Sequence, residues 1–292
     1  MTATEDKTVG EYAPPSPEEI GISYDEFADF YRLINSDVGF HIGMWSGSAT
    51  EDGLSSVYDL SNKAQTRVVE YCIEALKLKS TDNLLDIGCG AGAPTVQIAQ
   101  HSGARATGIN VSKGQLAEAT ERAEAAGLAD RVKFEYGNAM ELAYEDETFD
   151  AAVAIDLFPH LSDRLQGFKE AYRVLKPGGT LLLSEFTYRG KAPDEQFNAY
   201  LETFQGMPPE VPEKTIALAG EAGFELVWAD RKTKDVALST EVMYFLYVDR
   251  HAEITERYGA EAVAGLDYVM PLVRAYMRDH LGYYYFLVQK PE

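Results

Sequence analysis

The stretch from Leu84 to Gly92, LLDIGCGAG, decides the fold of this chain of 292 residues. An apolar run leads into Asp86, then into a turn with a glycine at every second position, and a helical pattern follows the turn. Glycines let the backbone of such a turn approach a ligand closely, and the helix behind it presents free N–H groups. The stretch therefore predicts the first strand, turn and helix of a nucleotide-binding type of α/β sheet.

The spacing of these glycines differs from the pattern that binds a pyrophosphate. A dinucleotide-binding turn follows G-x-G-x-x-G, whereas Gly88, Gly90 and Gly92 follow G-x-G-x-G shortly after Asp86. A carboxylate that points at the ligand suits a cation better than a phosphate. The turn thus indicates a ligand other than a dinucleotide.

Strand and helix patterns alternate after this turn. The expected strands are 83–87, 104–110, 131–136, 149–155, 180–186, 224–229 and 283–289, and the expected helices between them are 93–100, 112–126, 162–175 and 213–222. The alternation predicts an α/β fold with a doubly wound, mostly parallel, seven-stranded sheet of Rossmann-like type.

The D-x-G-x-G-x-G turn resembles motif I of the class I methyltransferases that use S-adenosyl-L-methionine (SAM). Four further segments are similar to that family: GINVS at 108–112, GNAM at 137–140, AIDLFPHL at 154–161 and VLKPGG at 174–179. The resemblance covers roughly residues 60–230 and implies SAM as the cofactor. The cofactor-binding residues that it implies are Asp86, Gly88, Gly90, Gly92, Asn110, Gln115, Asn138, Ala139, Met140 and Asp156.

Two of these positions depart from the family pattern. The second strand often ends in an acid that accepts hydrogen bonds from the ribose, but here it ends in Asn110. The turn after the third strand often carries an aspartate near adenine, but here it carries Asn138. An amide oxygen is a weaker acceptor than a carboxylate, so we expect binding to be intact with a smaller contribution from charge.

Composition limits the partners of the chain. With 26 Lys and Arg against 47 Asp and Glu, the net charge is −21. Such a surface repels nucleic acids and anionic membranes, and no apolar run reaches the roughly 18 residues of a membrane-spanning helix. Two cysteines and no signal-peptide pattern predict a cytoplasmic protein without disulfides. We expect a small-molecule acceptor, no metal, no nucleic acid and no membrane insertion, and the sequence is compatible with a homo-oligomer.

The pattern divides the chain into five parts. We expect a mobile N-terminal tail at 1–20, an N-terminal helical lid at 21–60 and a SAM-binding core at 61–187. A cap insertion with a helix and the sixth strand follows at 188–238, and a helical cap insertion with the last strand at 239–292. The connection after the fifth strand is too long for a plain loop.

The segments outside the sheet are rich in aromatic residues and should meet over its carboxyl edge, where open α/β sheets bind ligands. We therefore expect a helical, aromatic-rich cap over a pocket for a lipophilic or aromatic molecule. The expected substrate residues are Tyr24, Tyr31, His41, Trp45, Phe158, Phe204 and Tyr244.

Two residues are candidates for catalysis. His160 follows the fourth strand, and an imidazole with an ordinary pKa near ~6.5 is a serviceable base; His41 is the second choice. Glu185, near the end of the fifth strand, is expected to face the same crevice. IDLFPHLSDR and LLLSEF are similar to bacterial natural-product O-methyltransferases of the rebeccamycin sugar type, which carry a histidine and an acid at these places. Pro159 replaces the first of two adjacent histidines found there, which leaves His160 as the single base.

These observations predict a SAM-dependent methyltransferase that acts on a small lipophilic or aromatic metabolite, with O-methylation in secondary metabolism as the first hypothesis. Alternatives within the class are C-methylation of an alkene in a prenyl or sterol-like acceptor, in which aromatic faces and Glu185 would hold a cation, and N-methylation. A different class is a cyclase or binding protein with the SAM fold that transfers no methyl group.

Overall fold

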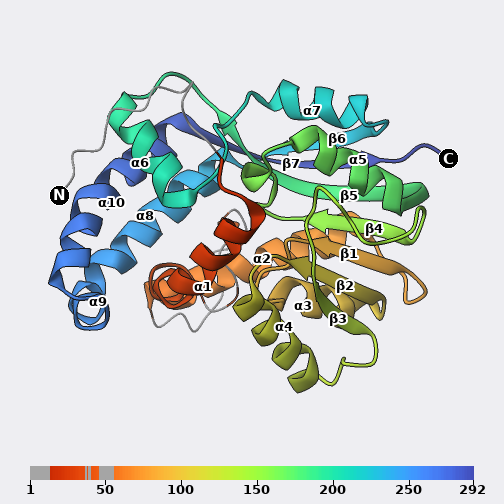
Figure 1. Cartoon of the computed structure of the whole chain (residues 1–292), viewed down its shortest axis with the longest axis horizontal. Coiled ribbons are helices and arrows are strands. Elements are labelled where there is room, and N and C mark those ends of the chain that lie inside the picture. Colours follow the sequence, from red (N-terminus) through yellow and green to blue (C-terminus); the bar gives the residue numbers. More distant parts are fainter. Residues whose placement is uncertain (1–13, 37, 39–40, 46–55) are drawn as a thin grey trace.

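The computed structural model describes residues 14–36, 38, 41–45 and 56–292. Its centre is a seven-stranded sheet with the order β3-β2-β1-β4-β5-β7-β6 (Figure 1). The strands are β1 (Asn83–Ile87), β2 (Arg105–Asn110), β3 (Val132–Tyr136), β4 (Phe149–Ala154), β5 (Leu175–Tyr188), β6 (Glu225–Arg231) and β7 (Leu281–Gln289).

The sheet is mostly parallel, as the alternation of strands and helices predicted. β1, β2, β3, β4 and β5 pair in parallel, whereas β7 runs antiparallel to both β5 and β6. Its reversal follows from the chain, because β7 comes directly after a helix that ends at His280 and pairs at once with the far end of β5.

Helices cover both faces of the sheet, which makes it doubly wound. One face packs against α2 (Val57–Leu76), α3 (Ala93–Ser102) and α4 (Lys113–Ala125), and the other packs against α5 (Arg164–Val174) and α7 (Pro212–Glu221). Successive residues of β5 serve both sides, because side chains alternate along a strand: Leu182 lies in the first core, and Leu181 and Leu183 lie in the second.

The remaining helices gather beside the carboxyl ends of the strands (Figure 1). They are α1 (Pro17–Ile34), α6 (Asp194–Phe204), α8 (Thr233–Asp249), α9 (His251–Tyr258) and α10 (Ala260–His280), with a short helix η1 (Phe158–His160) after β4. α1 contacts α4 on one side and α8 on the other. Its residues Phe30, Leu33 and Ile34 share a small core with α8, α9 and α10. Within the described part of the chain, none of the helices combines the length and hydropathy needed to cross a membrane.

Several expected boundaries differ from those of the helices and strands. The tail was expected to reach residue 20, but α1 begins at Pro17, because Ser16 and Glu19 form a capping box and Pro17 suits the first helical position. The expected divisions after residues 60, 187 and 238 fall inside α2, β5 and α8. Residues 1–13 lie outside the described part, and the five-part division remains a prediction.

Candidate active site

Two adjoining cavities lie at the carboxyl ends of the strands. The first encloses about 1360 Å³, part of it open to solvent, and lies over the ends of β1, β2, β3 and β4. The second encloses about 730 Å³ and lies between α1, η1, α6, α8 and α10. Four residues line both cavities: Tyr24, His41, Asp156 and His160.

The glycine turn forms the floor of the first cavity. Gly88, Gly90 and Gly92 all have positive φ (81°, 54° and 78°), a conformation that favours glycine. A Cβ atom at Gly90 would meet no protein atom within 4 Å, so the cavity side of this residue is open to a ligand.

Gly92 packs against neighbouring elements, whereas we expected it to contact the cofactor. It does not line the cavity but is the N-cap of α3. A Cβ atom there would lie 2.6 Å from Cβ of Ala119 and 2.7 Å from Cζ of Phe134. The third glycine of the motif therefore permits close packing of the turn against α4 and β3, and the other nine expected cofactor residues line the cavity.

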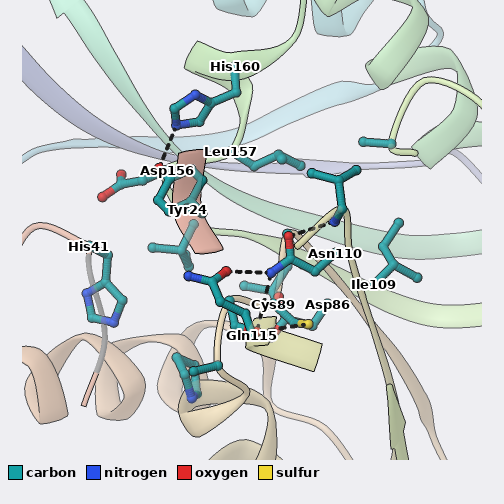
Figure 2. Close-up of a pocket in the computed structure, with 18 of the residues that line it drawn as sticks. Tyr24, His41, Asp86, Cys89, Ile109, Asn110, Gln115, Asp156, Leu157 and His160 are labelled. Carbon is teal, nitrogen blue, oxygen red and sulfur yellow. Dashed lines mark hydrogen bonds between the residues drawn. The ribbon is translucent and has the colours of Figure 1, made fainter. Parts of the chain in front are cut away.

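Hydrogen bonds hold the polar side chains of the first cavity in place. Asp86 accepts a hydrogen bond of 2.5 Å from Thr95 Oγ1, and burial raises the pKa of this carboxyl to about 6. Asn110 donates from Nδ2 to Gln115 Oε1 at 2.7 Å and accepts from the Val111 N–H at 2.8 Å (Figure 2). These bonds fix the orientation of the amide that replaces the usual acid.

The turn after β3 forms the next wall. Asn138 Oδ1 accepts a hydrogen bond of 3.0 Å from the N–H of Met140, and Ala139 is buried between them. Asn138, Ala139 and Met140 all line the cavity. Together with Ile109 they offer an apolar slot with polar edges, as an aromatic base requires.

Helix α1 covers the first cavity. Pro17, Ile20 and Tyr24 line it from above. Gly21 lies so close to the end of β2 that a Cβ atom would come within 2.3 Å of the Val111 carbonyl oxygen.

Asp25 fastens the same helix to α4. Its Oδ1 accepts hydrogen bonds from Ser112 Oγ and, at 3.0 Å, from the Gly114 N–H. About two turns further along, Arg32 forms an ion pair with Glu118. No local pattern predicts these contacts, because each joins residues more than 80 positions apart.

The second cavity contains four of the seven expected substrate residues: Tyr24, Tyr31, His41 and Phe204. Residues that the pattern did not single out complete its wall, with apolar, aromatic or neutral polar side chains for the most part: Asn35, Ile42, Pro159, Phe186, Tyr200, Gly206, Ser239, Thr240, Met243 and Met277. Among the described residues that line it there is no lysine or arginine.

Three expected substrate residues lie elsewhere. Trp45 is tied to α8, since its N–H donates to Asp235 Oδ1 at 2.8 Å and its Nε1 donates to Ser239 Oγ at 2.7 Å. Phe158 is fully buried and packs on Phe168 with ring centroids 4.4 Å apart. Tyr244 packs in the α1–α8 core beneath the Arg274 guanidinium. None of the three lines either cavity.

His160 lies where the two cavities meet. Helix η1 places it directly after β4, and its Nε2 lies 3.1 Å from Tyr24 Oη of α1 (Figure 2). Burial lowers the pKa of His160 to about 4, although the nearby Asp156 carboxylate raises it. The imidazole is therefore neutral at physiological pH, with a much lower pKa than the reference value used above.

His41 is the second histidine of this junction. It is buried, with 8% of its surface exposed, and its Nδ1 lies 3.3 Å from the Ile42 carbonyl oxygen. Its Nε2 is buried and has no hydrogen-bond partner in the described part of the protein. Desolvation lowers the pKa of His41 below its ordinary value.

Asp156 connects the elements around the junction. It has a positive φ of 53°, which is uncommon for a residue other than glycine. Its Oδ1 accepts from Ser184 Oγ and from Tyr283 Oη, both at 2.6 Å, and its Oδ2 accepts from the Ile42 N–H at 2.9 Å. One carboxylate thus joins β4 to β5, β7 and the segment that carries His41.

Glu185 does not face the crevice, contrary to our expectation. Its neighbours Ser184 and Phe186 point toward Asp156 and the second cavity, so the alternation of β5 directs Glu185 to the opposite face. It is 1% exposed, lines neither cavity, and pairs with Arg164 at 3.8 Å. Burial raises the pKa of this carboxyl to about 7.

The chain is similar in sequence to several methyltransferases. A family profile described as a methyltransferase domain matches residues 85–183. The chain is 40% identical to 27-O-demethylrifamycin SV methyltransferase of Amycolatopsis mediterranei (strain S699). The alignment extends over 173 residues, which are 59% of this chain and 60% of that protein. It is 36% identical to methyltransferase GfsG of Streptomyces halstedii, with 64% of each chain covered. The aligned part thus spans less than two thirds of these two relatives. A third relative aligns over a larger share of its length. The chain is 32% identical to O-methyltransferase resE of Aspergillus sclerotiorum, with 73% of this chain and 78% of that protein covered.

Solved structures share the fold over nearly the whole chain. The [4+2]-cyclase SpnF superposes with a TM-score of 0.79 at 27% identity and covers 95% of this chain and 98% of its own. The cyclopropane synthase MmaA2 of Mycobacterium tuberculosis superposes with a TM-score of 0.81 at 18% identity and covers 95% and 99%. The second likeness is one of fold alone.

Proposed function

Because the chain belongs to the family of SAM-dependent methyltransferases, we propose that it transfers the methyl group of SAM to a hydroxyl oxygen of a small lipophilic or aromatic metabolite of secondary metabolism. The observation that carries the proposal is the 3.1 Å contact between Tyr24 Oη and His160 Nε2 where the two cavities meet. A proton-accepting pair at the junction between a cofactor cavity and an apolar cavity is the arrangement that methylation of a hydroxyl needs.

The first cavity fits SAM by its own chemistry. Gly90 leaves space for close approach of a ligand, and Asp86 supplies a carboxylate for a cationic group. Asn110 and Gln115 would hold the ribose, and Ala139 and Met140 would lie beside adenine. When bound, SAM supplies a methyl group that its sulfonium has already activated.

The second cavity would hold the acceptor. Its wall of aromatic and methionine side chains from α1, α6, α8 and α10 supports a lipophilic or aromatic molecule and a role for these helices as an aromatic cap. Tyr24, Tyr31, His41 and Phe204 are the acceptor-binding residues that we propose from the expected set. The contacts of α1 with β2 and α4 support the lid expected for this part of the chain.

The proton of the acceptor hydroxyl has a route through the Tyr24–His160 pair. When the acceptor oxygen takes the methyl group and S-adenosylhomocysteine is the leaving group, the hydroxyl proton would pass to Tyr24 Oη while Tyr24 would give its own proton to His160 Nε2. Tyr24 begins and ends neutral, in agreement with burial that raises its pKa and disfavours a phenolate. Asp156 raises the pKa of His160 and so stabilises the imidazolium that forms.

Incubation with SAM labelled in its methyl group tests this proposal. The position of the label in the product, read by NMR, separates an O-methyl from a C-methyl or N-methyl group. Label on oxygen is expected; label on carbon or nitrogen would favour one of the other two reactions. C-methylation loses support from the position of Glu185, which does not line the cavity and so cannot hold a cation there.

One observation favours a second candidate function. The likeness to the [4+2]-cyclase SpnF extends over 95% of this chain, so the same cavities could promote a ring closure while SAM remains intact. In that case SAM would bind but no product would carry label, and an unlabelled product of unchanged mass would accumulate from a polyene substrate.

A further inference from the structure

We infer that the acceptor is an uncharged molecule with a second hydroxyl group, and that this hydroxyl donates a hydrogen bond to Nε2 of His41. The inference rests on the proposed function, because it assigns the acceptor to the second cavity. It adds a chemical requirement that methyl transfer itself does not impose.

The tautomer of His41 follows from its neighbour. Its Nδ1 lies 3.3 Å from the carbonyl oxygen of Ile42, and a carbonyl oxygen can only accept a hydrogen bond. Nδ1 therefore carries the proton of the neutral ring, and Nε2 presents a lone pair. Burial favours the neutral ring, since it lowers the pKa of His41.

This lone pair of Nε2 is buried and accepts no hydrogen bond from the described residues. His41 is 8% exposed, and within the described part of the protein nothing donates to its Nε2. Buried acceptors in proteins are nearly always satisfied. Figure 2 shows His41 among the residues that line the first cavity. Because His41 also lines the second cavity, a molecule that bridges them is placed to supply the missing donor.

The group that meets Nε2 must be a donor. A ketone, ether or ester oxygen would bring a second lone pair against the first, whereas a hydroxyl group would satisfy it. The first hydroxyl of the acceptor is used at the Tyr24–His160 pair, so the donor at His41 is a second one.

The charges around the second cavity exclude an anion. Of the described residues that line it, none is a lysine or arginine, and Asp156 places a carboxylate in the wall. The Asp156 oxygens already accept from Ser184, Tyr283 and the Ile42 N–H. A phosphate or carboxylate in this cavity would face that negative charge with no lysine or arginine among the described lining residues to neutralise it.

Calorimetry with a matched series of trans-decalin alcohols tests the inference. Each compound carries one hydroxyl and, one to four carbons away, a second hydroxyl, a methoxy group, a carboxylate or hydrogen. With S-adenosylhomocysteine in the cofactor site, the best diol should bind about tenfold more tightly than its methoxy and hydrogen counterparts, because an unmet buried acceptor costs that much. The hydroxy acid should bind most weakly.

Two variants of His41 assign the effect. His41→Phe keeps an aromatic ring but removes the lone pair, so the preference for the diol over the hydrogen compound should fall below about twofold. His41→Gln offers both a donor and an acceptor, so the diol and its methoxy counterpart should bind equally. Equal affinities for the diol and the hydrogen compound in the native protein would overturn the inference, as would tightest binding of the hydroxy acid. A native protein that distinguishes the series but transfers no methyl group would support the inference and contradict the proposed function.

Discussion

The two cavities are built in different ways, although they share four residues. The first is formed mainly by consecutive strand-and-turn units between Asp86 and Leu161. The second takes its wall from segments that extend from Tyr24 to Met277. The first can therefore be traced to local sequence motifs, whereas the second exists only when distant helices have packed.

Their polar groups differ as well. In the first cavity Asp86 is bonded to Thr95, and Asn110 to Gln115, so the binding groups are held in place before a ligand arrives. Where the second cavity joins the first, Nε2 of His41 has no donor among the described residues. Rigid groups suit a cofactor that is always the same, and the unmet group gives the acceptor cavity its selectivity.

The largest effect should come from filling the first cavity. Gly90→Val places a branched side chain in the open space above the turn, so it should abolish SAM binding measured by calorimetry. Gly127→Val is the matched control, because Gly127 also has a positive φ (69°), also leaves its Cβ position free of neighbours, and lies outside both cavities. Both variants carry the backbone strain of a side chain at positive φ, roughly 1–2 kcal/mol. Native affinity in a folded Gly90→Val protein would remove the turn from the cofactor site.

The next effect concerns the pair where the cavities meet. His160→Ala should lower kcat by about 10² to 10⁴, the usual contribution of a general base. Tyr24→Phe should lower it as well, and the double variant should be little worse than His160→Ala, because both residues serve one proton transfer. His101→Ala, which removes an exposed histidine of α3, controls for a general effect. If the factors by which the two single changes lower kcat multiply in the double variant, then Tyr24 and His160 do not serve one proton transfer.

The pH profile provides a separate test of the same pair. The base acts in its neutral form, and burial lowers the pKa of His160 to about 4. At saturating SAM, where protonation of Asp86 in the empty cofactor cavity does not enter kcat, kcat should therefore be flat through neutral pH and fall as the pH drops toward about 4. His160→Ala should lack this inflection. A native inflection near 6.5 instead would mean that the imidazole is solvated during the reaction.

The sequence could predict the first cavity because its signals are local. The turn at Asp86, the end of β2 at Asn110 and the turn at Asn138 each follow a strand directly, and parallel strands bring such ends to one edge. The packing of Gly92 could not be predicted in this way, because its neighbours Ala119 and Phe134 come from other elements.

The second cavity exposed the limits of such reasoning. An alternating strand shows which residues share a face but not which face meets the ligand, and this is why Glu185 was expected in the crevice. Trp45 is of a residue type that often contacts an apolar ligand. Its hydrogen-bond partners Asp235 and Ser239, however, lie 190 and 194 positions away. The contact of Tyr24 with His160 spans 136 positions and has no local signature.

A smaller effect concerns Glu185, which lies behind the wall of the second cavity, and the pH dependence of the free energy of unfolding. Burial raises the pKa of Glu185 from about 4.5 to about 7, so the folded protein binds this proton more tightly than the unfolded chain does. The resulting stabilisation is complete below about pH 4.5 and is lost as the pH rises through 7, a change of about 3 kcal/mol. Glu185→Gln has no proton to release and should lack this part of the decline.

Urea unfolding at about pH 5 and about pH 7.5 measures the difference. Glu225→Gln, at an exposed position of β6, controls for the loss of one negative charge. If Glu185→Gln and the native protein lose the same free energy of unfolding between the two pH values, then Glu185 is ionised throughout and its pair with Arg164 is stronger than its desolvation.

The smallest effect tests the helix that joins the two cavities. α1 lies over the cofactor cavity through Ile20 and carries Tyr24 to the junction, and Asp25 fastens it to Ser112 and Gly114 of the α4 terminus. Asp25→Ala removes both hydrogen bonds, so the Kd for SAM should rise about three- to tenfold, as expected for the loss of one or two exposed hydrogen bonds.

The same change should also reach the acceptor side, because α1 carries Tyr24 to His160. kcat should therefore fall by a similar factor at saturating SAM, while Glu26→Ala, an exposed neighbour on the same helix, should leave both constants near their native values. A rise in Kd with no change in kcat would mean that α1 closes over the cofactor but does not position the proton-accepting pair. The two cavities would then be neighbours without being coupled, and the contact of Tyr24 with His160 would depend on the packing of α1 against α8 rather than on its bonds to α4.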